Sequence, residues 1–86
     1  MYKIIFKKTA TKEFLSLPIK TQTEIGEKLT LLSLWREELL DIKILSPKEE
    51  KRYRMRVWKY RVIYRIEHAE LIIYVIKIWS RWDVYK

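Results

Sequence analysis

The stretch from Tyr53 to Ile66 constrains the fold more than any other part of the chain. It reads Tyr-Arg-Met-Arg-Val-Trp-Lys-Tyr-Arg-Val-Ile-Tyr-Arg-Ile, so apolar and basic side chains alternate almost without interruption. Alternation with a period of two, in residues that are largely β-branched or aromatic, is typical of strands. Two strands fit this length if a tight turn at Trp58-Lys59 joins them. The stretch therefore predicts a β-hairpin.

A two-residue turn also fixes which residues of the two strands face one another. The expected pairs are Val57 with Tyr60, Arg56 with Arg61, Met55 with Val62, Arg54 with Ile63 and Tyr53 with Tyr64. Successive side chains of a strand point to opposite faces of the sheet. The mainly apolar set is therefore expected to face a core. The other set, expected to form a basic face, is Arg54, Arg56, Arg61, Ile63 and Arg65.

This basic face indicates an anionic partner. Like charges directly opposite each other destabilise a sheet by roughly 0.2–1 kcal/mol per pair. Acids that would offset them are scarce, because residues 51–86 hold ten Lys and Arg against three Asp and Glu and so carry +7 of the net charge of +8. A guanidinium matches a phosphate with a planar fork of donors. The alternative is a solvated face whose arginines are paired by acids from elsewhere in the chain.

Length and composition narrow the class of protein. The 86 residues are enough for a single domain, residues 1–86, with one core. Met1 to Ala10 has no apolar segment typical of a secretion signal, and the longest apolar run, Leu71 to Ile76, is too short to cross a bilayer. These features predict a cytoplasmic protein that does not enter a membrane.

Several kinds of reactive site are excluded by residue counts. The chain has no cysteine and one histidine, His68, which lies in a predicted turn, so neither a catalytic triad nor a zinc site is expected. A single glycine excludes a glycine-rich phosphate loop. No cofactor is predicted. The remaining reactive set is arginine, lysine and tyrosine around a phosphate.

The rest of the chain supplies helices to cover the apolar side of the hairpin. The pattern predicts a strand over residues 1–7, a helix over 10–17 capped by Thr9, a helix from Pro18 to Trp35, an extended piece over 39–45 and a strand over 71–79. Gly26, in the middle of the second helix, is expected to allow close packing against a neighbour. The fold class is α+β, with two N-terminal helices packed on one face of a four-stranded, mostly antiparallel sheet in the order β-α-α-β-β-β.

One motif carries a resemblance to a known family. Tyr60-Arg-Val-Ile-Tyr64, an acidic turn, an apolar strand and the terminal Ser80-Arg-Trp-Asp-Val-Tyr85 follow one another. Together they resemble the RelE branch of the RelE/ParE toxin superfamily, whose fold has the predicted order of elements. The resemblance implies a toxin of a type II toxin–antitoxin system, and specifically a ribosome-dependent mRNA endonuclease. Members of this branch need no metal, and they cut by attack of the 2′-OH on the adjacent phosphate.

The resemblance also implies partners and site residues. Expected partners are the ribosome, mRNA and a cognate antitoxin that wraps the domain with acidic and apolar residues. Catalytic positions of the family fall on Arg56, Arg61, Arg81 and Tyr85. Arg61 matches the arginine that holds the scissile phosphate, and Arg81 the arginine proposed to protonate the leaving oxygen. Candidates for RNA binding are Arg54, Lys59, Arg65 and Trp82.

The chain departs from the family pattern at three places. The hairpin turn usually holds Gly-Asp or Gly-Asn, and here it is Trp58-Lys59; Ser80 replaces a common histidine or lysine, and Trp79 replaces a glycine. Arg56 also stands where a lysine base is common, and arginine stays protonated in proteins. The general base is therefore open between Lys59 and Tyr85, and weak activity is one expectation.

Two other functions fit the sequence less specifically. One is a ParE-like gyrase poison, which binds a protein and cuts no RNA. The other is a non-catalytic basic module that binds nucleic acid or an acidic protein. The arginines on the central strands and the Arg81/Tyr85 pair favour the RelE-like function.

Overall fold

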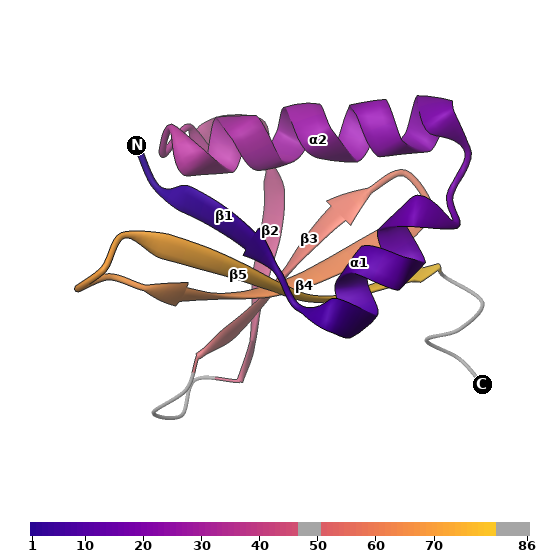
Figure 1. Cartoon of the computed structure of the whole chain (residues 1–86). Helices are drawn as coiled ribbons and strands as arrows, with labels where there is room; N and C mark the ends of the chain where they lie inside the picture. Colours follow the sequence, from indigo (N-terminus) through magenta and orange to yellow (C-terminus); the bar gives the residue numbers. More distant parts are fainter. Residues whose placement is uncertain (47–50, 81–86) are drawn as a thin grey trace.

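Two helices lie against one side of a mixed β-sheet in the computed structural model, which describes residues 1–46 and 51–80 (Figure 1). The elements in order are β1 (Lys3–Phe6), α1 (Lys8–Leu15), α2 (Ile19–Ser33), a short 3-10 turn η1 (Glu37–Leu39), β2 (Asp41–Ser46), β3 (Arg52–Val57), β4 (Tyr60–Glu67) and β5 (Ile72–Ser80). Helix α2 runs across the sheet, and α1 lies beside the end of β1.

The sheet has five strands in the order β1-β5-β4-β3-β2. Strand β1 runs parallel to β5, and every other neighbouring pair is antiparallel. The α+β class and the helix placement are confirmed, but the expected strand count of four is wrong. The additional strand is β2, which forms the edge next to β3. An edge strand pairs with one neighbour and is only partly buried, so its apolar pattern is weak. The sequence therefore predicts that this segment is extended, but it does not show that the segment joins the sheet.

The predicted register of the hairpin is confirmed in full. All five expected pairs, from Val57 with Tyr60 to Tyr53 with Tyr64, are neighbours between β3 and β4. The turn residue Trp58 has a φ of 57°, in the left-handed region. Residues with a Cβ atom are disfavoured there by roughly 1–2 kcal/mol. This strain explains why glycine is the ordinary choice for such a turn and makes the tryptophan unusual.

The backbone strain at the turn can be measured with two truncations of the same side chain. Both Trp58→Ala and Trp58→Gly remove the ring, but only glycine adopts a φ of 57° without a steric penalty. After the larger unfolded-state entropy of glycine is subtracted, Trp58→Gly should be the more stable variant by about 0.5–1 kcal/mol. Urea unfolding of the two variants checks this. An alanine variant as stable as the glycine variant would contradict a strained turn.

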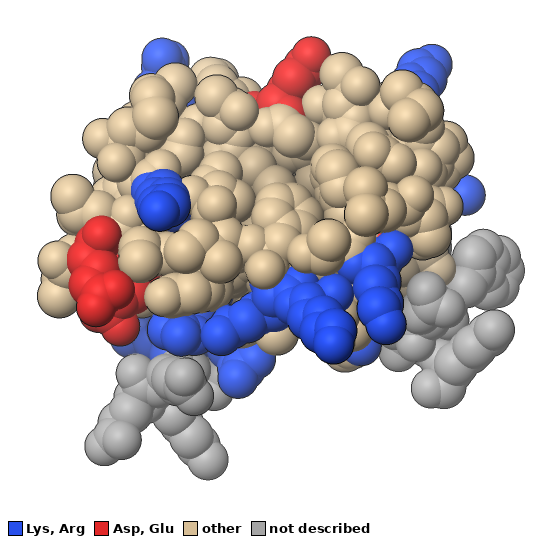
Figure 2. All heavy atoms as spheres, in the orientation of Figure 1, with Lys and Arg blue, Asp and Glu red and all other residues tan. Residues whose placement is uncertain are grey.

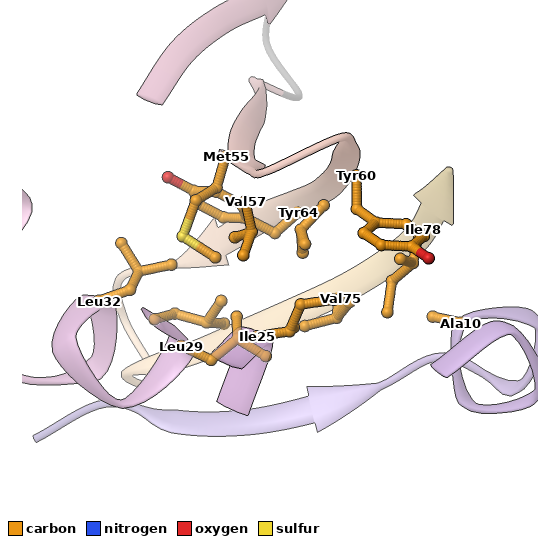
Figure 3. Packing of buried hydrophobic residues seen from close by; sticks show 12 residues of the cluster. Ala10, Ile25, Leu29, Leu32, Met55, Val57, Tyr60, Tyr64, Val75 and Ile78 are labelled. Carbon is orange, nitrogen blue, oxygen red and sulfur yellow. The ribbon is translucent and has the colours of Figure 1, made fainter. Parts of the chain in front are cut away.

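The hydrophobic core lies between α2 and the sheet. Ile25, Leu29 and Leu32 lie on one side of α2 and are at most 3% exposed. They face core residues of the sheet such as Met55 and Val75, which are fully buried (Figure 3). The same core contains Ala10 of α1 and the β-strand residues Val57, Tyr60, Val62, Tyr64, Ile73 and Ile78. The alternation of the hairpin therefore directs its apolar set toward the helices, as predicted.

Two local predictions about the helices are wrong. Helix α1 begins at Lys8 with Lys7 at the capping position and no side-chain cap, so Thr9 lies inside the helix. The reason is that the Lys7 N–H donates to the Val75 carbonyl at 2.8 Å, which extends the pairing with β5 until the helix starts. Gly26 does not pack closely either, because a Cβ atom placed on it would meet no heavy atom within 4 Å.

Helix α1 is tied to β5 by one carboxylate. Beyond the end of β1, the N–H of Ile78 donates to Glu13 Oε1 at 2.9 Å, and Lys77 Nζ lies 3.5 Å from Glu13 Oε2. Strand β1 ends before it could pair with Ile78, so the Glu13 side chain accepts the hydrogen bond of the Ile78 N–H instead. This contact fixes the end of β5 that leads to residue 80.

Candidate functional site

The side of the sheet that the helices leave open carries most of the positive charge. By register, the cations there are Lys3, Lys43, Arg52, Arg54, Arg56, Arg61, Arg65 and Lys77, which we call the basic face. Figure 2 shows Lys and Arg atoms gathered along the side of the molecule that lies away from α2. The predicted separation of an apolar and a basic face on the hairpin is thus present in the fold.

Two of the predicted arginines are paired with the same carboxylate. Asp41, the first residue of β2, lies opposite Arg56 in the sheet. Its Oδ2 is 2.8 Å from Arg56 Nε, and its Oδ1 is 3.3 Å from Arg54 Nη2. For Arg54 and Arg56, the alternative expectation, that acids from elsewhere in the chain pair with the arginines, is therefore correct. No local sequence pattern indicates this contact, because 13 positions separate Asp41 from Arg54.

Arg61 has a different environment. Its Nη1 atom is buried and has no hydrogen-bond partner, and no carboxylate within residues 1–46 and 51–80 forms an ion pair with it. It lies directly opposite Arg56. Leaving a buried donor unsatisfied costs about 1–3 kcal/mol, and more for a charged group. An anion at Arg61 would remove this cost, so Arg61 is the strongest single candidate for a phosphate contact among the described residues.

Aromatic rings flank the arginines on the same face. The guanidinium of Arg65 lies 4.3 Å from the ring centroid of Tyr74, and Lys7 Nζ lies 4.8 Å from it. Lys77 Nζ lies 5.5 Å from the ring centroid of Trp79, which is opposite Arg61. Cations over aromatic faces are attracted by the ring quadrupole. The predicted binding residue Arg65 is therefore held against Tyr74 at the far end of the row of arginines.

Among the other candidates, the structure places Lys59 away from this row. Lys59 lies in the hairpin turn with Nζ 5.6 Å from the ring centroid of Tyr60, a side chain that faces the core. It is not brought to the basic face with Arg61. Tyr64 is also unsuited to accept a proton, because burial, with Glu37 and Tyr53 adding to it, raises the pKa of Tyr64 far above its ordinary value. Arg81, Trp82 and Tyr85 lie outside the described residues.

A pocket that the sequence did not predict opens at the turn end of the hairpin. It has a volume of about 390 Å³ and is lined by Glu24, Lys28, Leu39, Leu40, Asp41, Arg56, Val57 and Trp58. Arg56 and Asp41 therefore belong both to this pocket and to the arginine row. The one sequence feature that could have indicated this pocket is Trp58, an unusual residue for a predicted turn.

Asp41 should act as an internal competitor for anions. In Asp41→Asn the carboxylate charge that holds Arg56 and Arg54 is lost. We expect affinity for a polyanion such as poly(U) to rise about fivefold, which corresponds to about 1 kcal/mol for a partly exposed ion pair. Salt-dependent filter binding measures this.

The matched control is Glu38→Gln, which changes the net charge equally. Glu38 is bound to Arg36 at 2.7 Å in η1, and this hydrogen bond holds the pKa of the Glu38 carboxyl below its usual range. Glu38 does not pair with the arginine row. An equal rise in both variants would mean that only net charge matters and would contradict a specific role for Asp41.

Among residues 1–46 and 51–80, no cluster of three His, Asp or Glu side chains has an arrangement that could hold a metal ion. No helix in this part of the chain is long and apolar enough to cross a membrane.

The fold and the basic face together define a protein with the RelE-like toxin fold. The archaeal RelE–RelB complex from Pyrococcus horikoshii matches with a TM-score of 0.79 and 26% identity over 93% of this chain and 94% of that chain. The RelBE2 toxin–antitoxin complex from Mycobacterium tuberculosis matches with a TM-score of 0.72 and 25% identity over 93% and 98%. The intact Escherichia coli RelBE complex, at 20% identity and a TM-score of 0.73 over 93% and 96%, shares the fold.

The family follows from the sequence. The sequence model of the ParE toxin of the type II toxin–antitoxin system parDE matches residues 4–85, so the chain belongs to this family, within the RelE/ParE superfamily. No curated protein sequence matches the chain. The chain is a toxin of a type II toxin–antitoxin system, as the resemblance implied.

Proposed function

We propose that this toxin is a ribosome-dependent mRNA endonuclease that acts in the cytoplasm. The RNA phosphate would lie on the basic face, where the buried and unpartnered Nη1 of Arg61 carries the proposal. Cleavage is by attack of the 2′-OH on the adjacent phosphate, which leaves a cyclic phosphate and a 5′-OH on the two fragments. No metal is required in this scheme.

Electrostatic stabilisation by arginine is the step that the geometry supports best. Arg61 and Arg56 are neighbours across β3 and β4, so both guanidinium groups can reach one phosphate. Preorganised cations of this kind stabilise the charge that develops on a pentavalent phosphate. In this proposal Arg81 protonates the leaving 5′ oxygen and Tyr85 orients the substrate, as in the family. The group that removes the 2′-OH proton is not assigned to Arg56, since arginine stays protonated.

A ParE-like gyrase poison is the second candidate function. It is favoured by the family match over residues 4–85, which is to ParE toxins. Such a toxin would bind an enzyme and would not cut RNA itself. The row of arginines on the central strands argues for the RNA-cutting function, because two of its members, Arg54 at Nε and Arg61 at Nη1, have a buried donor without a partner, and of these two only Arg54 has a carboxylate partner among the described residues.

We propose a cognate antitoxin as the regulatory partner. Two surfaces suit an acidic and apolar segment: the basic face and an apolar groove of about 400 Å³ between α1, α2 and β1, which includes Phe6, Phe14 and Gly26. Leu15, which also lines the groove, is 65% exposed. The RelE relatives described above were crystallised with RelB, which supports a protein partner of this kind. A neutral or basic antitoxin footprint in hydrogen exchange would contradict it.

Primer extension on cellular mRNA after induction tests the endonuclease. Cuts within translated codons, which require ribosomes and persist in EDTA in a purified system, are expected. Induction of DNA damage without mRNA cuts would support the gyrase poison instead. Binding to RNA with neither effect would indicate a non-catalytic module.

One conservative substitution distinguishes between an electrostatic role of Arg56 and a need for a general base at this position. Arg56→Lys keeps the charge but replaces the forked guanidinium, which is already aligned by Asp41 at 2.8 Å, by a single ammonium. If Arg56 is an electrostatic clamp, cleavage on programmed ribosomes should fall less than about tenfold. General base catalysis contributes about 10²–10⁴-fold to a rate. A cleavage rate about a hundredfold higher, with a new acidic limb in its pH profile, would therefore show that a base had been restored.

A further inference from the structure

The pocket at the turn end of the hairpin combines a flat aromatic ring with charges of both signs. Trp58 contributes the ring, Arg56 and Lys28 contribute cations, and Glu24 and Asp41 contribute carboxylates. Its volume of about 390 Å³ lies within the roughly 300–1,000 Å³ of small-ligand sites. The pocket is separate from Arg61, which is not among its lining residues.

Packing does not explain the tryptophan at this position. Trp35 also has a positive φ, 61°, but its ring stacks on Tyr2 at 4.7 Å and meets His68 edge-on. Trp58 is 54% exposed, and within residues 1–46 and 51–80 its ring has one aromatic or cation–π contact, with Lys20 Nζ at 6.0 Å from the ring centroid. The turn itself requires a positive φ, as at Leu71 in the next hairpin turn, but it favours glycine and gives no reason for an indole. A half-exposed indole on a strained backbone is therefore a candidate binding surface.

The chemistry of the lining selects the kind of group that fits. The carboxylates of Glu24 and Asp41 repel a phosphate, so an anion belongs on the basic face and not in this pocket. A neutral planar group with hydrogen-bond donors and acceptors on its edge can use both the ring and the mixed charges. An unstacked nucleobase has these properties, and aromatic side chains bind such bases by stacking.

Arg56 connects the two sites. It lines the pocket and lies opposite Arg61, so a nucleotide with its phosphate at the arginine row can place a neighbouring base beside Trp58. We propose that this pocket binds one unstacked base of the RNA, with Trp58 as the stacking surface. The proposal rests on the proposed function, because it assumes that RNA occupies the basic face.

Binding of a five-nucleotide RNA with 2′-O-methyl groups, which cannot be cut, tests the pocket on the full chain. Loss of base stacking on alanine substitution corresponds to about 5- to 150-fold in affinity. We therefore expect that range for Trp58→Ala, little change for Trp58→Phe, and no change for the control Trp35→Phe, which keeps a ring stacked on Tyr2. Melting temperatures of all variants exclude a folding defect.

Abasic oligonucleotides give the decisive comparison. Removing the base at one position should abolish the difference between the natural chain and Trp58→Ala, while removing the others should not. Equal affinity of Trp58→Ala, or an equal loss with every abasic oligonucleotide, would overturn the pocket assignment. Weaker antitoxin binding by Trp58→Ala without an effect on RNA would overturn it as well, in favour of a protein ligand.

The same measurements separate this inference from the proposed function. If Arg61→Ala loses RNA binding and mRNA cleavage while Trp58→Ala keeps both, the pocket is wrong and the endonuclease stands. If the natural chain neither binds the oligonucleotide nor cuts mRNA, the endonuclease is wrong and the pocket fails with it.

Discussion

Arg61→Met is expected to abolish mRNA cleavage without destabilising the protein. The variant removes the guanidinium that is proposed to meet the scissile phosphate, and loss of one preorganised donor to developing charge typically costs about 10²–10³-fold in rate. It also removes a buried nitrogen that has no partner and a like charge opposite Arg56. Both changes relieve the folded state, so unfolding free energy should stay constant or rise by up to about 1–3 kcal/mol.

A rise in stability together with a loss of activity would mark Arg61 as a functional residue that is unfavourable for folding. The measurements are single-turnover cleavage on programmed ribosomes and urea unfolding of the same preparations. Lys43→Met is the control, because Lys43 is an exposed cation of the basic face on the edge strand β2. It removes the same charge and should lower cleavage only slightly. Full activity of Arg61→Met at equal expression would refute the assignment.

The hairpin shows how much of the fold was available in the sequence. Its register followed from alternation and a two-residue turn, since one shifted position would have turned Met55 and Val62 toward solvent and two arginines into the core. The same reasoning identified the basic face. Both features are local, because the strands are joined by Trp58-Lys59 and no distant segment is needed to define them.

The edge of the sheet could not be predicted in the same way. Residues 47–51 separate β2 from β3 in the sequence, and Ile44 of β2 remains 52% exposed, so β2 has only a weak apolar pattern. The pairing of Asp41 with Arg56 depends on this strand. The sequence therefore indicated a row of equivalent arginines, whereas the fold makes Arg54 and Arg56 paired and Arg61 unpaired among the described residues.

The helix details were missed for a related reason. Thr9 is a favourable cap by residue type, but the pairing of β1 with β5 sets where α1 begins. Gly26 was assigned to close packing because that is the common reason for a glycine within a helix. In the structure it instead lines the apolar groove beside α1, a surface that exists only once both helices are placed.

Ile25→Ala should be among the most destabilising single changes in this domain. Ile25 is 0% exposed, lies on α2 and is part of the core cluster on the sheet. Truncation of a buried isoleucine to alanine typically costs about 2–5 kcal/mol, whereas Ile→Val costs about 0.5–1.5 kcal/mol. Because a small domain has a total stability of only about 5–15 kcal/mol, the alanine variant should show a greatly lowered urea midpoint.

The control for Ile25→Ala lies on the same helix and involves the same chemical change. Ile19, in the first turn of α2, is 74% exposed, so Ile19→Ala removes the same atoms with little loss of burial and should change stability by less than about 0.5 kcal/mol. The difference between the two variants isolates the contact of α2 with the sheet from helix propensity, which is shared. Since α2 also supplies Glu24 and Lys28 to the pocket, Ile25→Ala should weaken RNA binding by the Trp58 site before the β3–β4 register is lost. A difference below about 1 kcal/mol would show that α2 contributes little to the core.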